Sequence, residues 1–99
     1  MRDDELLTLL LRRIDEEWNE PTLPVRARNC LPKKNIIFWG DLIQIPSGYF
    51  FSVPGLGKGT LAEVDRILLE HGLFRGMEIP VKVYEKFKAH RANIIRGAS

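Results

Sequence analysis

The sequence predicts an all-α fold, a compact bundle of short helices joined by brief loops. Apolar residues recur three and four positions apart through most of the chain, whereas the alternation typical of strands is nearly missing. Prolines and glycines separate the periodic segments, at points where helices commonly begin and end. With 99 residues and 44% hydrophobic content, the protein has room for one small globular core.

The first expected helix covers residues 3–20. Acidic side chains occupy its first turn, where they favour a helix N-terminus. Its apolar residues form a wide stripe, which consists of Leu6, Leu7, Leu10, Leu11, Ile14 and Trp18. Pro21 and Pro24 end this helix, because proline disfavours helical backbone in the residue before it. We therefore treat residues 1–20 as an N-terminal helical extension.

Five further helices are expected, over residues 23–31, 36–44, 47–52, 58 or 60 to 71, and 81–95. Pro24 falls in the first turn of its helix, where proline is tolerated. Ser47 is the expected cap of a short helix, and Gly72 is the kind of residue that ends a helix in the left-handed conformation. Together these signals place a helical bundle over residues 21–78 and a C-terminal helical extension over residues 79–99.

The net charge of +2 hides an asymmetry along the sequence. Residues 1–20 hold three basic and seven acidic side chains, and residues 21–99 hold twelve basic and six acidic ones. A basic body behind an acidic leader is consistent with a modest nucleic-acid surface. The single cysteine, Cys30, and an N-terminus unlike a signal peptide favour a cytoplasmic protein, and a nucleic-acid surface would make it nucleoid-associated. No apolar run approaches the ~20 residues of a membrane span.

The most informative segment is the turn that precedes the helix at residue 58 or 60. Gly55, Gly57 and Gly59 alternate there, and glycine permits positive φ and close approach of a ligand to the backbone. Thr60 and Glu63 have the spacing of a capping box. Consecutive N–H groups before a helix form an anion site, although such a turn can also be a simple connection between packed helices. The spacing does not match a nucleotide-binding P-loop, and no strand pattern precedes the turn as a Rossmann motif requires.

The sequence predicts no catalytic site, no metal and no cofactor. His71 and His90 lie on different expected helices without a second ligand at metal-binding spacing, and Cys30 has no histidine beside it. Neighbouring carboxylates along a helix diverge, so they do not converge on a substrate.

Contact with nucleic acid fits the residues better. Arg26 and Asn29 are three positions apart on one expected helix and so share a face. Arginine can enter a narrow minor groove, and lysines such as Lys33, Lys34 and Lys58 can contact phosphates. This pair of residue types is also common on solvated helices, so the spacing alone leaves both interpretations open.

Several separated motifs point to a family resemblance. They occur in one order and in close register: VRARNCL at residues 25–31, GDL at 40–42, LGK at 56–58, EV at 63–64, HGL at 71–73 and GM at 76–77. Together they resemble the C-terminal domain of the bacterial RNA polymerase α subunit (α-CTD) over residues 23–77. A weaker likeness, LLR at residues 10–12, lies upstream.

This resemblance implies a helix-hairpin-helix domain of the SAM-like type that binds the minor groove of A/T-rich promoter DNA. The residues that it implies for DNA contact are Arg26 in the groove, Asn29 and Cys30 beside it, and Gly57, Lys58, Thr60 and Glu63 at the phosphates. It also implies contacts with RNA polymerase, with sigma factor near Glu20 and Thr22, and with a transcription regulator near Ser47 and Tyr49.

The sequence departs from the family at identifiable positions. Gly59 and Pro32 stand where basic residues are usual, so we expect weaker and more salt-tolerant DNA binding. The usual charges near Ser47 and Tyr49 are missing. The family's N-terminal domain is also absent from this sequence, so the protein is either an excised piece or, as the two added helices favour, a free-standing relative.

The added helices leave two alternatives for the apolar stripe, which can pack against residues 81–95 or mediate self-association. Two other functions also stay open. A protein-interaction module that has lost DNA binding would contact polymerase, sigma or regulators. A helix-hairpin-helix accessory of DNA repair would bind duplex without A/T preference.

Overall fold

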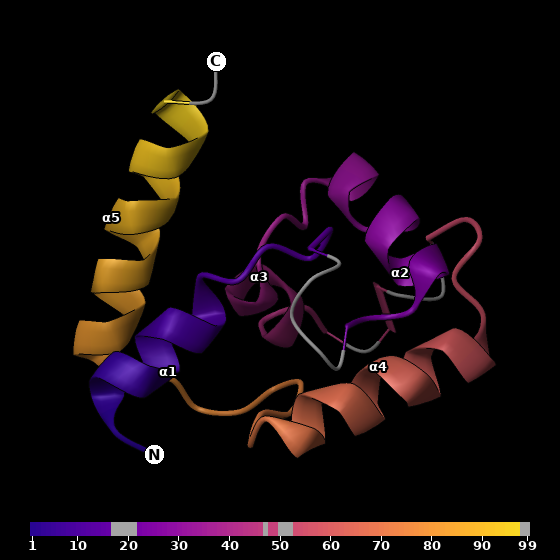
Figure 1. The fold of residues 1–99 in the computed structure, drawn as a ribbon, viewed down its shortest axis with the longest axis horizontal. Helices are drawn as coiled ribbons and strands as arrows, with labels where there is room; N and C mark the ends of the chain where they lie inside the picture. The colour runs from indigo at the N-terminus through magenta and orange to yellow at the C-terminus, as the bar shows by residue number, and fades with distance from the viewer. Residues whose placement is uncertain (17–21, 47, 50–52, 98–99) are drawn as a thin grey trace.

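The computed structural model describes residues 1–16, 22–46, 48–49 and 53–97, and Figure 1 shows short helices joined by loops. The elements are α1 (Asp3–Leu10), α2 (Val25–Cys30), the 3-10 helix η1 (Pro32–Lys34), α3 (Trp39–Ile43), α4 (Lys58–Glu70) and α5 (Val81–Gly97). Over the described ranges the β-type pairing amounts to one isolated bridge, between Arg13 and Phe38. The predicted all-α class is therefore confirmed.

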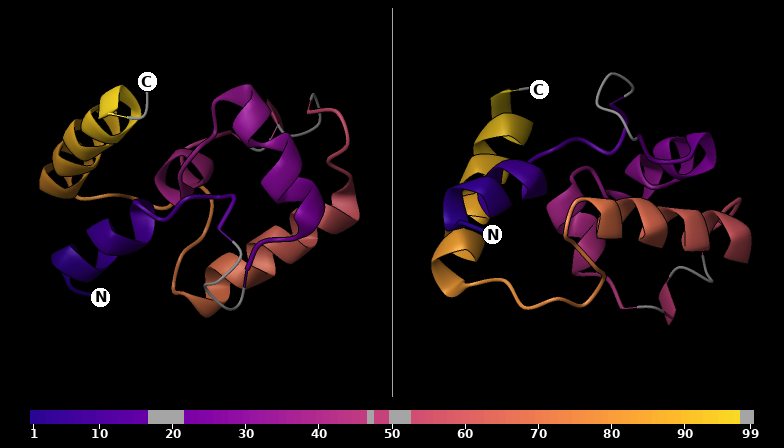
Figure 2. Two further views of the ribbon diagram at one scale, coloured as in Figure 1. Left: turned by 45° about the horizontal axis from the view of Figure 1, so that its top comes forward. Right: turned by 60° about the horizontal axis from the view of Figure 1, so that its bottom comes forward.

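The helices form two groups around one core. α4 packs against α2 on one side of the molecule, while α1 contacts both α3 and α5 on the other. Figures 1 and 2 show α1 and α5 together as a flank, with the last turns of α5 rising beyond the rest of the fold. Fully buried side chains come from both groups and include Leu10, Leu31, Leu42, Leu68, Leu73 and Phe87.

The α1 helix is shorter than the apolar stripe predicts. It ends at Leu10, and the segment after it becomes extended and pairs with the residues before α3. The Ile14 N–H donates to the Ile37 carbonyl at 2.9 Å, and the Trp39 N–H donates to the Arg12 carbonyl at 2.9 Å. The expectation of a helix continuing beyond residue 10 was wrong, because tertiary pairing outweighed periodicity. Trp18 and Glu20 lie outside the described residues.

The α3 helix starts three residues later than expected. Phe38 is its N-cap, and residues 36–38 are not helical. The Asp41 side chain instead forms hydrogen bonds with the backbone before the helix. The Asp41 Oδ2 atom accepts hydrogen bonds from the N–H groups of Ile37 and Phe38, each at 3.1 Å. The short helix expected at residues 47–52 lies largely outside the described residues.

The remaining helices agree with expectation. α2, α4 and α5 begin and end within two residues of the predicted bounds. Gly72 has a φ of 78° after the end of α4, as expected for a left-handed terminator. Arg75 then fixes the following loop to α4 through a forked pair with Asp65, with N–O distances of 2.7 and 2.9 Å. Hydrogen bonding to Asp65 raises the pKa of Arg75, and burial opposes it only in part.

The α5 helix packs tightly onto the rest of the fold. Val83 and Phe87 are its buried residues, and a Cβ atom placed on Gly40 would lie only 2.5 Å from the Phe87 ring. Phe87 also meets Phe38 edge to face, with ring centroids 6.3 Å apart. The structure thus shows α1 and α5 packed within one molecule, which is one of the two alternatives considered for the stripe.

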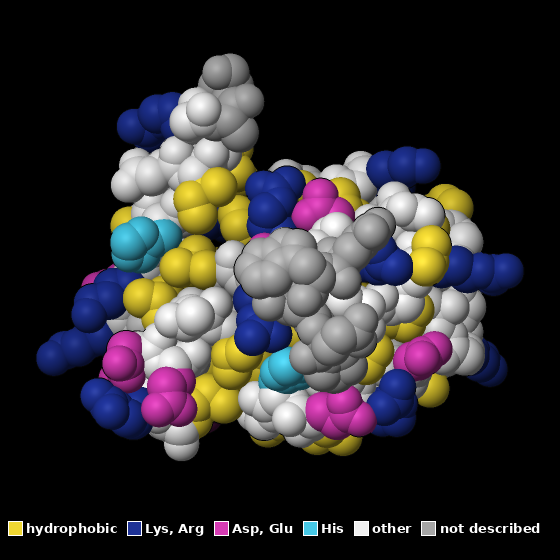
Figure 3. Space-filling view, viewed as in Figure 1, with side chains coloured by type: hydrophobic (Ala, Val, Ile, Leu, Met, Phe, Trp, Pro, Cys, Tyr) yellow, Lys and Arg dark blue, Asp and Glu magenta, His cyan; other side chains and the backbone are white. Residues whose placement is uncertain are grey.

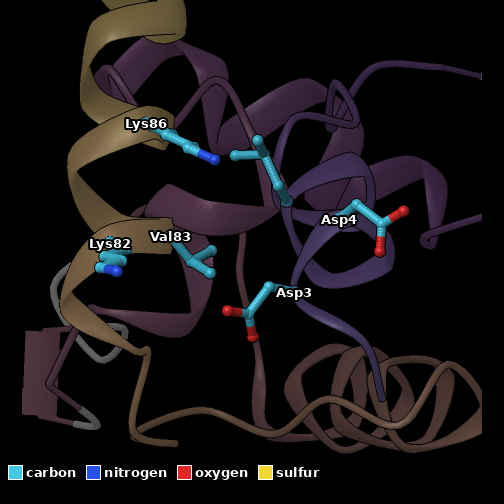
Figure 4. Close-up of a pocket in the computed structure, with 6 residues that line it drawn as sticks. Asp3, Asp4, Lys82, Val83 and Lys86 are labelled. Carbon is cyan, nitrogen blue, oxygen red and sulfur yellow. The ribbon is translucent and has the colours of Figure 1, made fainter.

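A shallow groove separates the first turns of α1 and α5 (Figure 4). Acidic side chains from α1 and lysines from α5 line it, namely Asp3, Asp4, Lys82 and Lys86, together with Leu7 and Val83. Among the described residues there is no helix long and apolar enough to cross a membrane. Nor does this described part of the protein bring three or more potential metal ligands together.

Candidate nucleic-acid interface

The α2 helix and the glycine turn before α4 form one continuous edge of the molecule. A Cβ atom on Gly55 would lie 3.0 Å from the Cys30 Sγ atom, and Gly55 has a φ of +84°. Glycine at this position is therefore required both by backbone conformation and by the close approach of α2. Val53 and Leu56, which are buried, anchor the turn to the core. The two predicted halves of the site are thus brought into contact.

The beginning of α4 presents its first backbone N–H groups at this edge. Gly57 is the N-cap, and the first helical hydrogen bond runs from the Leu61 N–H to the Gly57 carbonyl at 3.1 Å. The amides that precede Leu61 in a helix have no carbonyl partner within that helix, and the helix dipole adds positive potential there. Such an end is suited to bind an anion.

The predicted capping box at Thr60 and Glu63 was wrong. Because α4 begins at Lys58, Thr60 is its third residue and is half-buried, and the helix has no cap from a side-chain hydrogen bond. Glu63 is exposed one turn further along and lies 3.6 Å from an Arg66 nitrogen. The box failed because glycine at position 57 took the N-cap place three residues earlier.

Gly57 and Gly59 leave the backbone open to solvent. No heavy atom lies within 4 Å of a Cβ position on either residue, and neither has a positive φ. The fold itself does not need glycine at these two positions. Their effect is to remove side chains from the surface around the first amides of α4, so that a ligand can approach the backbone closely.

The α2 helix presents a polar row beside this turn. Arg26 and Asn29 are exposed, Cys30 is half-buried, and Ala27 and Leu31 face the core. Leu31 has helical backbone angles, with φ −66° and ψ −44°, so η1 continues the direction of α2 for another turn.

This continuation extends the row along the surface. Arg26, Asn29 and Lys33 are spaced by three and four residues, the spacing of neighbours on one helix face. The sequence alone suggested Lys33 only as a spare phosphate contact. Pro32, expected near the end of a helix, is in fact the first residue of η1, and proline is favoured at such positions.

The charge of the segment that contains α2 and η1 has one sign. Residues 22–40 contain four basic side chains (Arg26, Arg28, Lys33 and Lys34) and no acidic one. Arg28 is partly engaged with the protein, because its Nε donates to the Leu23 carbonyl at 3.0 Å. In Figure 3 several Lys and Arg side chains stand out along the right-hand edge, where α2 and the beginning of α4 lie in Figure 1.

The structure describes only two of the four predicted partner-contact residues. Glu20 and Ser47 lie outside the described residues, Thr22 is half-buried, and Tyr49 is exposed. An exposed apolar pair that the sequence reasoning missed, Leu69 and Phe74, flanks a groove beside the Asp65–Arg75 ion pair. Leu69 is an apolar residue on the otherwise polar face of α4. Its position in the helical pattern is the sequence signal that could have revealed the pair.

Residues 9–70 match the model of a protein family, the C-terminal domain of the bacterial RNA polymerase alpha subunit. The match spans more than half of the sequence, so the protein belongs to this family. Members are non-catalytic domains of a polymerase subunit and generally bind DNA, in agreement with the prediction that this protein is not an enzyme. The match begins at residue 9, within α1, and ends before α5.

Proposed function

We propose that this domain binds the minor groove of A/T-rich DNA in transcription, with Arg26 in the groove and the glycine turn on the phosphates. The contact between Cys30 and Gly55 carries this proposal. It joins the two elements into one rigid edge, so a groove-reading arginine and a phosphate-binding turn keep a constant separation. Binding then costs little ordering of the protein.

Each residue of the edge has a role that its chemistry supports. An exposed arginine is attracted by the strong negative potential of a narrow minor groove, which A/T-rich sequences favour. Asn29 can donate to base edges or backbone oxygens beside it. The backbone amides of residues 58–60 and the Lys58 ammonium bind phosphate oxygens, with the Thr60 hydroxyl as a further donor.

Glu63 takes a different role, because a carboxylate repels phosphate. Its 3.6 Å separation from Arg66 leads us to propose that it orients this arginine, which also donates to Glu70 at 2.7 Å. Surface ion pairs of this type are weak, so the contribution of Glu63 to DNA affinity is expected to be small.

The boundaries of the domain are also a proposal. The sequence suggests residues 21–78 with extensions at 1–20 and 79–99. The family match from residue 9, together with the hydrogen bond between Arg12 and Trp39, favours assigning the residues from 9 onward to the DNA-binding unit.

A second function is supported by the surface at the far end of α4. Leu69 and Phe74 are 63% and 54% exposed, and two apolar side chains this exposed in a single groove favour contact with a protein. The alternative is therefore a protein-interaction module that binds RNA polymerase, sigma factor or a regulator without DNA.

The test is fluorescence anisotropy with an A-tract duplex and a mixed-sequence duplex at about 50 and about 200 mM salt. Arg26→Ala is expected to abolish binding to the A-tract while circular dichroism stays unchanged. The matched control is Lys82→Ala, which removes one exposed positive charge from α5 on the opposite flank and should bind normally.

The outcomes separate the candidates. Retained affinity of Arg26→Ala at low salt would refute the groove role. Equal binding of both duplexes would indicate a general duplex binder of the repair type. Absence of binding to either duplex, with co-purification of polymerase or sigma, would establish the interaction module instead.

A further inference from the structure

Arg91 links α5 to the corner that follows η1. Its Nε donates to the Asp41 Oδ1 atom at 2.8 Å, and its Nη2 donates to the Asn35 carbonyl at 3.2 Å. Its guanidinium carbon also lies 5.9 Å from the centre of the Phe38 ring. Because α5 lies beyond the residues that match the family, this connection depends on a helix outside that match.

Asp41 makes the connection rigid because both of its oxygens are used. Oδ2 accepts from the N–H groups of Ile37 and Phe38, while Oδ1 accepts from Arg91. The side chains of Arg91 and Asp41 are only 22% and 16% exposed, so solvent weakens their pairing less than at the surface. One carboxylate therefore ties the segment before α3 to α5.

The corner lies at the surface, between the buried Leu31 and Ile36. η1 contributes no buried residue, and it ends at Asn35, whose φ of 63° is unusual for a residue other than glycine. Local bonds hold it, from the Asn35 N–H to the Pro32 carbonyl at 3.0 Å and from the Ile36 N–H to the Leu31 carbonyl at 3.2 Å. Arg91 adds a contact from a distant helix to the Asn35 carbonyl at the corner.

We propose that Arg91 is a positioning residue for DNA binding, which holds residues 32–35 so that Lys33, in the row that Arg26 begins, and the adjacent Lys34 can contact phosphates. This inference rests on the proposed function. The two lysines are exposed and adjoin Asn35 in sequence, so a shift of the corner moves their charges away from the phosphates. In this way α5, which lies outside the matched segment, supports the phosphate-binding edge. This edge has Gly59 and Pro32 at two positions where basic residues are usual.

The first experiment measures DNA affinity against salt for Arg91→Ala. Each phosphate contact contributes about 0.9 to the slope of log K against log salt, or about a threefold change in affinity between ~50 and ~200 mM. Arg91→Ala is expected to flatten the slope by about 0.9 to 1.8, the loss of one or both lysine contacts. Lys88→Ala, which removes one exposed charge one turn earlier on α5, should keep the wild-type slope.

Arg91→Lys guards against loss of folding. A lysine can still pair with Asp41, but its single ammonium lacks the fork that reaches both Asp41 and the Asn35 carbonyl. It is expected to retain the wild-type melting temperature and still flatten the slope. A wild-type slope in both Arg91 variants overturns the proposal, whatever happens to the melting temperature.

A double-mutant cycle tests whether Arg91 acts through the lysines. In a Lys33→Ala/Lys34→Ala background, Arg91→Ala should cause no further change in the slope. An additive effect shows that Arg91 acts elsewhere and overturns the inference. If Arg26→Ala binds like the wild type, the proposed function itself has failed; if it loses binding while the Arg91 slopes stay unchanged, only the present inference has failed.

Discussion

Glycine has opposite roles on the two sides of this molecule. At the interface edge, Gly57 and Gly59 face open space and keep the backbone accessible. On the α1–α5 flank, Gly40 is covered by the Phe87 ring, which lies 2.5 Å from where a Cβ atom would be. Gly57 and Gly59 leave the backbone exposed, whereas the missing side chain of Gly40 lets α5 pack closely.

The two regions also differ in what holds them. The interface edge is held by the packing of α2 against α4, by the close approach of Cys30 to Gly55 and by buried anchors in the turn. The flank is held by aromatic packing and by the Arg91–Asp41 pair. Both regions thus rest on buried packing, but the open glycines and the exposed basic residues, which carry the candidate function, lie on the edge.

Phe87→Ala should give the largest effect. Removing this buried ring leaves a cavity over Gly40, and a loss of about 3–5 kcal/mol in the free energy of unfolding is expected. Urea denaturation measures it, with Lys88→Ala as the control on the same helix. A loss below about 1 kcal/mol would mean that α5 is not part of the cooperative core.

Gly40→Ala should destabilise by a smaller amount, about 1–3 kcal/mol, because the added methyl group overpacks against the Phe87 ring. The same urea experiment measures it. The penalty should shrink in the Phe87→Ala background, since the clashing ring is gone. Full additivity of the two changes would contradict the contact.

Gly55→Ala tests the edge. Its positive φ costs an alanine about 1–2 kcal/mol, and the Cys30 sulfur must also move. Thermal unfolding should show the loss, together with weaker DNA binding because the turn shifts away from α2. Gly97→Ala, at the exposed end of α5, is the matched stability control, since its φ is not positive and its surroundings are open. Equal melting temperatures for both variants would rule out the strain argument.

Gly59 should give the smallest change in stability and a distinct change in binding. Gly59→Ala is expected to stabilise α4 by about 0.5–1 kcal/mol, because glycine is a poor helix former and the space is open. Gly59→Lys should in addition steepen the salt dependence of A-tract binding by about 0.9, as one phosphate contact is added. Anisotropy titrations of the two variants separate the effect of the lysine charge on DNA binding from the effect of helix propensity. An unchanged salt slope for Gly59→Lys would show that residue 59 does not face phosphate.

Helices with strong local signals were predictable. α4 and α5 follow from period, from the terminating Gly72 and from Pro80, all of which act within a few residues. Arg26 and Asn29 could be placed on one exposed face for the same reason. Three features were not predictable: the early end of α1, the late start of α3 and the failed capping box at Thr60. In each case another hydrogen bond or another N-cap residue competes with the local helical signal.

By itself, the sequence determined the helical class, the family, the basic character of residues 22–40 and the glycine turn, since composition, period and motif order are properties of the polypeptide alone. Only the tertiary structure decided that Cys30 meets Gly55, that Phe87 covers Gly40, and that Arg91 reaches both Asp41 and Asn35. These contacts join residues 25 to 56 positions apart. No local preference encodes such pairs; the burial of one shared core selects them.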